Sequence, residues 1–186
     1  MKEQLWIALK MTLVMTVLTG LIYPLAVTGV AQVFFPKAAN GSRLRRGGEW
    51  VGSRLIGQSW KGPEWFHGRP SAHNYNGLAS GGSNYGPSNQ QWVAAVTRRA
   101  GRWRRVTGQT RPVPADLVEA SASGLDPDIS PAAAAYQAAR VARARHLPLA
   151  RVQALIRRFT RGRTFGFLGA PRVNVLELNL ALLRQR

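Results

Sequence analysis

The chain has 186 residues and no cysteine, which excludes disulfide bonds and thiolate metal sites. It carries 26 basic and 8 acidic residues, a formal net charge of +18, as proteins with anionic partners often do. Because 22 of the basic residues are arginine, a bias typical of GC-rich genomes, the charge alone identifies no function. The length leaves room for one membrane anchor and one domain of about 150 residues with its own core.

Residues 11–31 form an uncharged stretch rich in Leu, Val, Met and Ile. As a helix it is roughly 30 Å long, the thickness of a bilayer's hydrocarbon core. Trp6 and the pair Phe34-Phe35 bracket it, as aromatic residues do at membrane interfaces. A cleaved signal peptide is the alternative, but its apolar region is usually about 7–15 residues long. The predicted segments are a short tail over 1–10, a transmembrane helix over 11–35, a basic linker over 36–48 and a soluble domain over 49–186.

The charges around this span predict its orientation poorly. Lys2 and Lys10 precede it, whereas Lys37 and several arginines follow it closely. Taken literally, the positive-inside rule places the soluble domain in the cytoplasm, although that rule is weak for long domains.

The soluble part begins with a short strand predicted over 50–58, followed by a long loop. Residues 62–89 are rich in Gly, Ser, Asn and Pro, with aromatic residues among them. A loop of this length in a compact domain is usually functional or disordered. Its aromatic content argues against disorder, so we predict that it is functional.

Three helices are predicted after this loop, which makes the domain α+β. Asn89 is placed to cap a helix that runs to about residue 106, and Ser130 to cap a second helix with Pro131 at its first position. The third begins near Pro148, has an apolar face with helical spacing and ends at Gly162. That face is made by Val152, Leu155, Ile156 and Phe159. The other predicted segments are an extended segment over 113–123, a turn over 124–127 and a strand or helix over 173–182.

A glycine-rich motif inside the loop suggests phosphate binding. Residues 81–88 have two glycines at Walker A spacing, but Pro87 stands where the lysine must be, so that match fails. A weaker similarity, to the Ser-Gly-Gly-Gln signature of transport ATPases, makes five residues candidates for ATP binding through backbone amides. They are Ser80, Gly81, Gly82, Ser83 and Asn84. The alternative is a turn-rich surface loop that docks on a partner.

No catalytic or metal site is predicted. His67 and His73 have no carboxylate or thiol nearby at ligand spacing, so we expect two surface histidines. No nucleophile elbow occurs, and no spacing couples a serine to a histidine and an aspartate. Asp116, Asp126 and Asp128 are explained by turn-making and helix capping.

Ordered motifs along the whole chain resemble one family. They include Gly52-Ser-Arg-Leu-Ile-Gly-Gln58, Phe66-His-Gly-Arg-Pro-Ser-Ala72, Ser80-Gly-Gly-Ser-Asn84, Ser121-Ala-Ser-Gly-Leu-Asp-Pro127 and Pro171-Arg-Val-Asn-Val-Leu-Glu-Leu-Asn179. Together they resemble the C subunit of the bacterial Kdp potassium-transporting ATPase. Asp128, Tyr85 and Ala170 depart from the usual residues of that family within retained motifs.

The resemblance implies a non-catalytic accessory subunit of the bacterial cytoplasmic (inner) membrane. Its implied partners are a channel-like potassium-binding subunit, a P-type ATPase subunit, a small single-helix subunit and membrane lipid, with no nucleic acid. The family places the soluble domain outside the cytoplasm, over the channel-like subunit, and we adopt that orientation against the charge count. A catalytic-chaperone role, in which ATP affinity of the ATPase subunit rises, is also proposed for the family, although no firmly bound cofactor is expected.

The loop over 62–89 is the expected docking surface, because adaptable Gly, Ser and Asn residues accompany aromatic anchors. The candidate contact residues are Phe66, Arg69, Tyr75, Asn76 and Asn89.

The competing hypothesis is a membrane-anchored basic domain that binds nucleic acid or an acidic envelope glycan. Residues 98–105 are its best candidate site. On a helix, however, their arginines point most of the way round, so they do not form one stacking groove.

Overall fold

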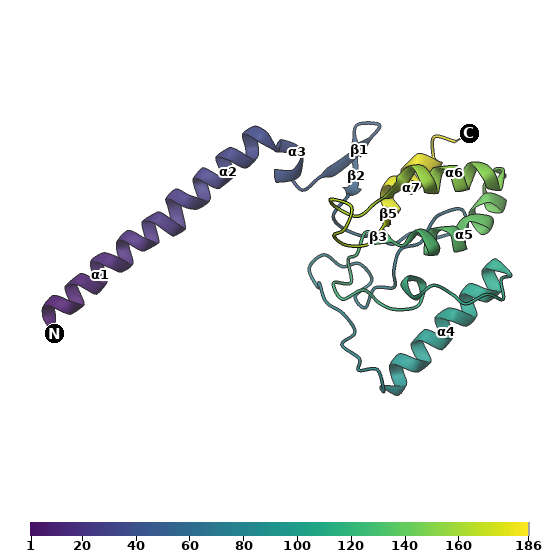
Figure 1. Cartoon of the computed structure of the whole chain (residues 1–186), viewed down its shortest axis with the longest axis horizontal. Coiled ribbons are helices and arrows are strands. Elements are labelled where there is room, and N and C mark those ends of the chain that lie inside the picture. The colour runs from purple at the N-terminus through teal and green to yellow at the C-terminus, as the bar shows by residue number, and fades with distance from the viewer. Residues whose placement is uncertain (186) are drawn as a thin grey trace. The chain divides into compact units, whose positions relative to one another are not determined.

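The computed structural model describes residues 1–185 (Figure 1). The chain divides into two compact units, Met1–Arg43 and Leu44–Arg186.

The first unit contains one helix that is continuous from Lys2 to Phe34 (Figure 1). It comprises α1 (Lys2–Val17), the π-helical turn η1 (Leu18–Ile22) and α2 (Tyr23–Phe34). Among the described residues it is the one helix long and apolar enough to cross a membrane, and none of its side chains is buried. It begins well before residue 11, so most of the predicted tail is helical. Within the predicted linker lies a short helix, α3 (Pro36–Ala39).

The π-helical turn lies directly before Pro24, where the regular hydrogen-bond ladder must break. Proline has no backbone N–H to donate to the carbonyl four residues earlier. The N–H of Tyr23 donates to the carbonyl of Leu18, five residues back, as in a π-bulge. The apolar helix therefore stays continuous through its proline.

A β-hairpin of β1 (Arg43–Arg46) and β2 (Glu49–Ser53) starts at the last residue of the first unit and otherwise belongs to the second. Gly47 and Gly48 connect the strands with φ of 58° and 88°, the positive values that a type I′ turn requires. The guanidinium of Arg45 lies 4.1 Å from the ring centroid of Trp50. The strand predicted over 50–58 thus ends at Ser53.

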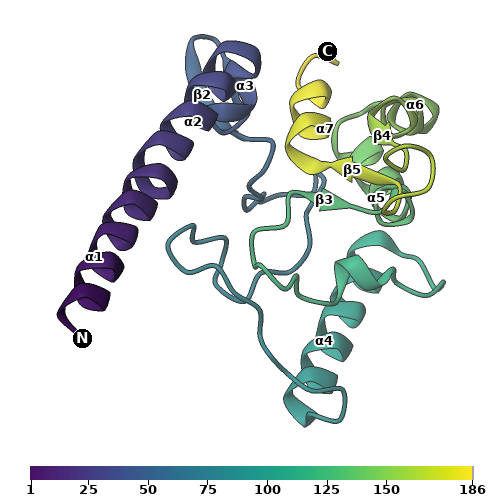
Figure 2. The ribbon, with the colours of Figure 1, turned by 60° about the vertical axis from the view of Figure 1, so that its left-hand side comes forward.

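Three helices and a small sheet enclose the core (Figures 1 and 2). The helices are α5 (Pro131–Ala144), α6 (Leu149–Phe159) and α7 (Val175–Leu182). The antiparallel strands β3 (Asp128–Ile129), β5 (Arg172–Asn174) and β4 (Thr160–Arg161) lie in the order β3-β5-β4, with Val173 paired to both Ile129 and Thr160. Fully buried side chains from these elements include Val141, Val152, Val173, Leu178 and Leu182.

Helix α4 (Gln90–Thr107) packs on this core through Trp103, with Val96 and Ala100 beside it. Indole Nε1 of Trp103 donates to the carbonyl of Leu117 (2.9 Å), in the 3-10 turn η2 (Ala115–Leu117). The ring of Trp103 meets that of Tyr136 edge to face, with centroids 6.5 Å apart. The segment predicted to be extended over 113–123 therefore contains a helical turn.

The α+β class and the predicted helix starts are confirmed. Asn89 accepts from the N–H of Gln91 (2.7 Å), and Ser130 accepts from the N–H of Ala133 (3.1 Å). The third predicted helix is expected to end at Gly162, but α6 ends at Phe159. From Thr160 the chain pairs as strand β4, so strand pairing and not the glycine ends the helix. The segment 173–182 contains both a strand and a helix, since β5 ends where the side chain of Asn174 caps α7.

Candidate functional site

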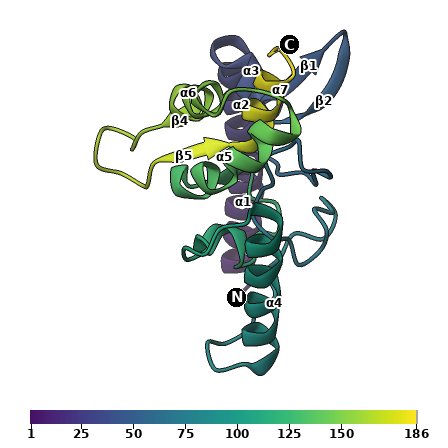
Figure 3. The ribbon, with the colours of Figure 1, turned by 90° about the vertical axis from the view of Figure 1, so that its right-hand side faces the viewer.

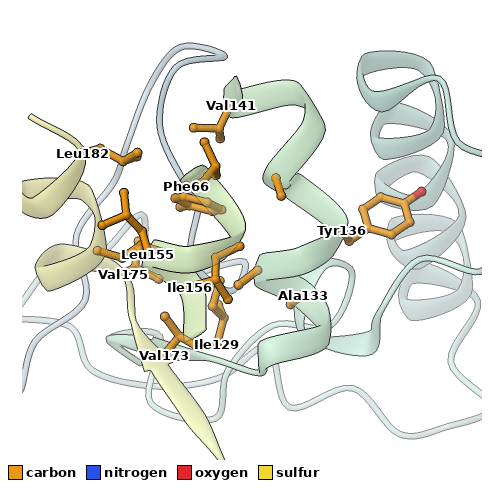
Figure 4. Close-up of a cluster of buried hydrophobic side chains, with 14 of the residues drawn as sticks. Phe66, Ile129, Ala133, Tyr136, Val141, Leu155, Ile156, Val173, Val175 and Leu182 are labelled. Atoms are coloured by element: carbon orange, nitrogen blue, oxygen red, sulfur yellow. The ribbon is translucent and has the colours of Figure 1, made fainter. Parts of the chain in front are cut away.

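The predicted contact loop enters the core at Phe66. Its backbone N–H donates to Oδ1 of Asn179 (2.9 Å), and its carbonyl accepts from Nδ2 of Asn179 (2.9 Å). The ring is 0% exposed and lies among Val141, Leu155 and Leu182 (Figure 4). The prediction that Phe66 contacts a partner is therefore wrong, because its ring is part of the core.

The next residue is held in the same way from a different helix. The N–H of His67 donates to Oε1 of Gln137 (2.9 Å), and its carbonyl accepts from Nε2 of Gln137 (3.0 Å). Asn179 and Gln137 are both fully buried. Two amide side chains thus act on residues 66 and 67 as a neighbouring strand would, and they fix the loop to α7 and α5.

Arg140 of α5 and Arg145, which directly follows α5, hold the turn before this anchor. Arg140 donates from Nη1 to the carbonyl of Pro63 (2.6 Å) and from Nη2 to that of Trp65 (2.8 Å). Arg145 donates from Nε to the carbonyl of Glu64 (2.7 Å). The turn over 62–66 therefore has a defined conformation without regular secondary structure.

Arg69 and Tyr75 are half-buried, and a hydrogen bond joins them. The Tyr75 hydroxyl donates to the carbonyl of Arg69, and the Arg69 guanidinium lies 3.4 Å from a carboxylate oxygen of Asp126. Ser71 Oγ accepts from the N–H of Tyr75 (2.9 Å). Burial raises the pKa of Tyr75 to about 12, with a further contribution from the charge of Asp126. Both side chains thus stabilise the turn over 69–75, and only part of each surface is available to a partner.

Asn76 and Asn89 have separate roles. Asn76 is exposed, and its Oδ1 accepts from the N–H of Leu78 (3.0 Å) in a turn that leaves the side chain of Leu78 99% exposed. Asn89 caps α4, a structural role that explains the residue without a partner. Of the five predicted contact residues, Asn76 is the one that is exposed and not a helix cap.

The glycine-rich segment packs against residues 121–124. The N–H of Gly81 and the hydroxyl of Ser80 both donate to the carbonyl of Ser123 (2.9 and 3.1 Å). A Cβ on Gly82 would lie 3.1 Å from the carbonyl oxygen of Ala122. Close packing between two backbone segments therefore accounts for this glycine, and two of the predicted phosphate donors already have partners.

The remaining members of this segment border a cavity. Ser83 and Asn84 line a space of about 370 Å³ with Trp92, Arg99 and Glu119. The acidic residue in this lining opposes the binding of an anion, whereas Arg99 favours it. The prediction of an ATP site at residues 80–84 stays untested.

The titratable side chains that the sequence singled out are held in structural contacts. His67 is half-buried, with Nε2 2.9 Å from the carbonyl of Gly62, so the expectation of two surface histidines is wrong for it. Burial lowers the pKa of His67, and the charges of Arg140 and Arg102 add to this effect. Over residues 1–185, no three His, Asp or Glu side chains group in a way that could hold a metal ion.

The expectation of turn-making and capping holds for Asp126 and Asp116, which accept from backbone N–H groups, but is wrong for Asp128, which lies in β3. Asp126 Oδ1 accepts from the N–H of Asp128 (3.0 Å), and Asp116 Oδ2 accepts from the N–H of Ser130 (2.6 Å). Asp128 pairs with Arg172 (3.3 Å) and accepts from Nδ2 of Asn174 (3.0 Å).

Sequence reasoning missed the polar residues that position the loop. Gln137 and Arg140 lie among alanines, and Asn179 follows three apolar residues of α7. A polar side chain on an apolar helical face needs a buried partner, and this is the signal that could have found them. It also missed the segment between β4 and β5, which projects from the fold (Figure 3) and exposes Phe165 and Phe167.

Comparison with known proteins gives full-length matches. A family model described as "KdpC: K+-transporting ATPase, c chain" matches residues 5–184. Among similar proteins, the "Potassium-transporting ATPase KdpC subunit" of Methylococcus capsulatus is 58% identical over 179 residues, 94% of each chain. The proteins of that name from Dechloromonas aromatica and Acidobacterium capsulatum are 52% and 54% identical. They cover 98% and 94% of this chain and 97% and 95% of their own.

Proposed function

The chain belongs to the KdpC family, the c chain of K+-transporting ATPases, and from this membership we propose that it is an accessory subunit of an ATP-driven potassium uptake complex. The observation that carries the proposal is the family match over residues 5–184, which includes both the apolar helix and nearly all of the folded unit. In this role the subunit stabilises the complex and contributes no hydrolytic chemistry. Its partners are a channel-like potassium-binding subunit, a P-type ATPase subunit and a small single-helix subunit.

Purification of the tagged full chain in a mild detergent tests this function. From cells that make the whole complex, we expect the channel-like and ATPase subunits to co-purify with it. Recovery of this chain alone under those conditions would contradict the proposal.

The helix Lys2–Phe34 serves as a single-pass anchor in the inner membrane, with the folded unit outside the cytoplasm. Its length, hydropathy and uniformly exposed apolar side chains support the anchor. The family resemblance supports the orientation, whereas the basic residues after Phe34 argue against it. A reporter enzyme that is active only after export, fused to the C-terminus, should be active. If instead only a reporter that requires the cytoplasm is active at the C-terminus, the folded unit lies in the cytoplasm and the proposed orientation is wrong.

Docking on the channel-like subunit uses the exposed part of the 62–89 loop. Leu78 is 99% exposed, on a turn that the side chain of Asn76 stabilises. An apolar side chain held in solvent by an ordered turn suits an interface anchor. We expect Leu78→Ser to reduce co-purification severalfold without lowering the melting temperature. Val93→Ser, at an exposed apolar position on α4, is the matched control and should change neither.

An effect on the ATP affinity of the ATPase subunit is part of this proposal. A domain outside the membrane cannot reach cytoplasmic ATP, so the effect is indirect and acts by shifting the conformational equilibrium of that subunit. The full chain alone should bind ATP weakly or not at all, because Pro87 replaces the Walker lysine. Calorimetric binding that survives high salt, prefers ATP to inorganic triphosphate and disappears in Ser83→Ala would instead establish a direct nucleotide site.

A further inference from the structure

A cavity of about 530 Å³ lies between the 59–63 turn, the 67–70 segment and helix α4. Its lining contains five basic residues and, among the described residues, no acidic one. The basic residues are Lys61, Arg69, Arg99, Arg102 and Arg140. Cationic walls around a partly desolvated space concentrate positive potential there.

Arg140 forms part of the inner wall and has no acidic partner. It is 5% exposed, and its terminal nitrogens donate to three backbone carbonyls and to Oε1 of Gln137 (2.8 Å). Nε of Arg140 is buried and has no hydrogen-bond partner among the described residues. Burial lowers the pKa of Arg140 to about 10, while the charge of Glu64 raises it and the charge of Arg102 lowers it. A buried guanidinium whose hydrogen-bond partners are all neutral keeps part of its charge uncompensated, which a bound anion would balance.

Two further arginines are held at the cavity, Arg99 by a backbone carbonyl and Arg69 by its ion pair with Asp126. Arg99 donates from Nη1 to the carbonyl of Val118 (2.8 Å), and burial lowers its pKa. Nε of Arg69 is buried without a partner in the described part of the chain. These side chains are already ordered, so binding a ligand costs little additional side-chain entropy. Arg102 and Lys61 are exposed and are free to close over a ligand from the solvent side.

Apolar and aromatic groups complete the lining. Trp103, Val106 and Leu117 border the same space. The ring of Trp103 also meets that of His67, with centroids 5.7 Å apart. A site with fixed charged groups on one side and apolar groups on the other is typical for a small anionic organic molecule.

We propose that this cavity binds a small molecule bearing a phosphate group, with Arg102 and Lys61 facing the oxyanion, the buried charge of Arg140 behind them and Trp103 facing the organic part. Guanidinium groups match the geometry of phosphate oxygens. None of the residues Ser80–Asn84 lines this cavity; Gly82, Ser83 and Asn84 line an adjoining one that shares Arg69 and Arg99 with it. The proposal does not depend on the place of the subunit in the complex. An acidic side chain of another protein is the less favoured occupant, because the innermost charge, that of Arg140, is almost entirely buried.

The test uses the full chain in a nonionic detergent, with binding followed by calorimetry at about 0.15 M salt. Inorganic triphosphate is the probe for a free phosphate compound, and a short-chain phosphatidic acid is the probe for a lipid headgroup. Arg102→Gln removes a charge from the cavity, whereas Arg104→Gln removes the same charge from α4 without touching the lining. Both positions are exposed, so both variants should fold, which Arg140 variants would not guarantee.

We expect saturable binding of at least one probe, weakened about fivefold or more by Arg102→Gln and less than about twofold by Arg104→Gln. Preference for triphosphate or for phosphatidic acid then identifies the source of the phosphate group. Equal weakening by the two variants would show only non-specific attraction to a basic protein, and would overturn the proposal. Absence of saturable binding for both probes would overturn it too, and would leave an acidic protein segment as the occupant to pursue.

Discussion

Replacement of Asn179 tests how the 62–89 loop is held in the fold. The residue is fully buried, and its side chain donates to the carbonyl of Phe66 and accepts from the N–H of Phe66, both at 2.9 Å. Replacement of Asn179 by Ala removes both hydrogen bonds and leaves two backbone groups of Phe66 without a partner in a site that water does not reach.

The size of the effect follows from those two groups. A buried donor or acceptor left unpaired costs about 1–3 kcal/mol, so two of them, after some relaxation, should cost about 2–4 kcal/mol. Since domains are stable by roughly 5–15 kcal/mol, this is a large fraction of the total. At about 2–4 °C per kcal/mol for a chain of this size, the melting temperature should fall by about 4–16 °C.

The assay is thermal unfolding of the full chain in detergent, followed by tryptophan fluorescence. Gln153→Ala is the control, since Gln153 is exposed on α6 and its loss should cost less than about 0.5 kcal/mol. If Asn179→Ala melts within about 2 °C of the unmodified chain, the amide does not anchor the loop and the reasoning fails.

Three further predictions concern charge, pH and the projecting segment. Burial lowers the pKa of His67 in the folded chain, so the unfolded chain binds a proton at this residue at a higher pH than the folded chain does. The free energy of unfolding should therefore fall as the pH drops below about 6.5. His67→Gln should make unfolding less pH-dependent between pH 7 and 5, and an unchanged pH dependence would refute this. Glu177 pairs with the partly exposed Arg54 and Arg161 at 2.8 and 2.7 Å. Glu177→Gln should therefore lower the free energy of unfolding by about 1 kcal/mol or less, and this difference should shrink in high salt. Phe165 and Phe167 are 85% and 68% exposed, so the double change to Ser should leave the melting temperature unaltered but reduce co-purification of partner subunits; full recovery of the partners would exclude this segment from the interface.

Much of the fold could be predicted because its signals are local. The apolar helix follows from an unbroken run of uncharged residues, and the caps at Asn89 and Ser130 depend on groups two or three residues away. The apolar spacing from Val152 to Phe159 predicted α6 for the same reason, since one helical face is read from neighbouring residues. These features need no knowledge of where distant parts of the chain lie.

Tertiary structure decided how the candidate site is built. Phe66 lies in a stretch that reads as an exposed loop, but its partner Asn179 is 113 residues away. The cationic cavity likewise combines Lys61, Arg102 and Arg140 from three separate segments, and no local pattern distinguishes these basic residues from others in an arginine-rich chain. Hydrogen bonding within a helix turn depends on sequence spacing, whereas burial and the sharing of a cavity depend on which distant segments the chain brings together. The sequence by itself therefore determined the apolar helix, the helix starts and the family, and only the packed structure decided which loop residues are core and which are exposed.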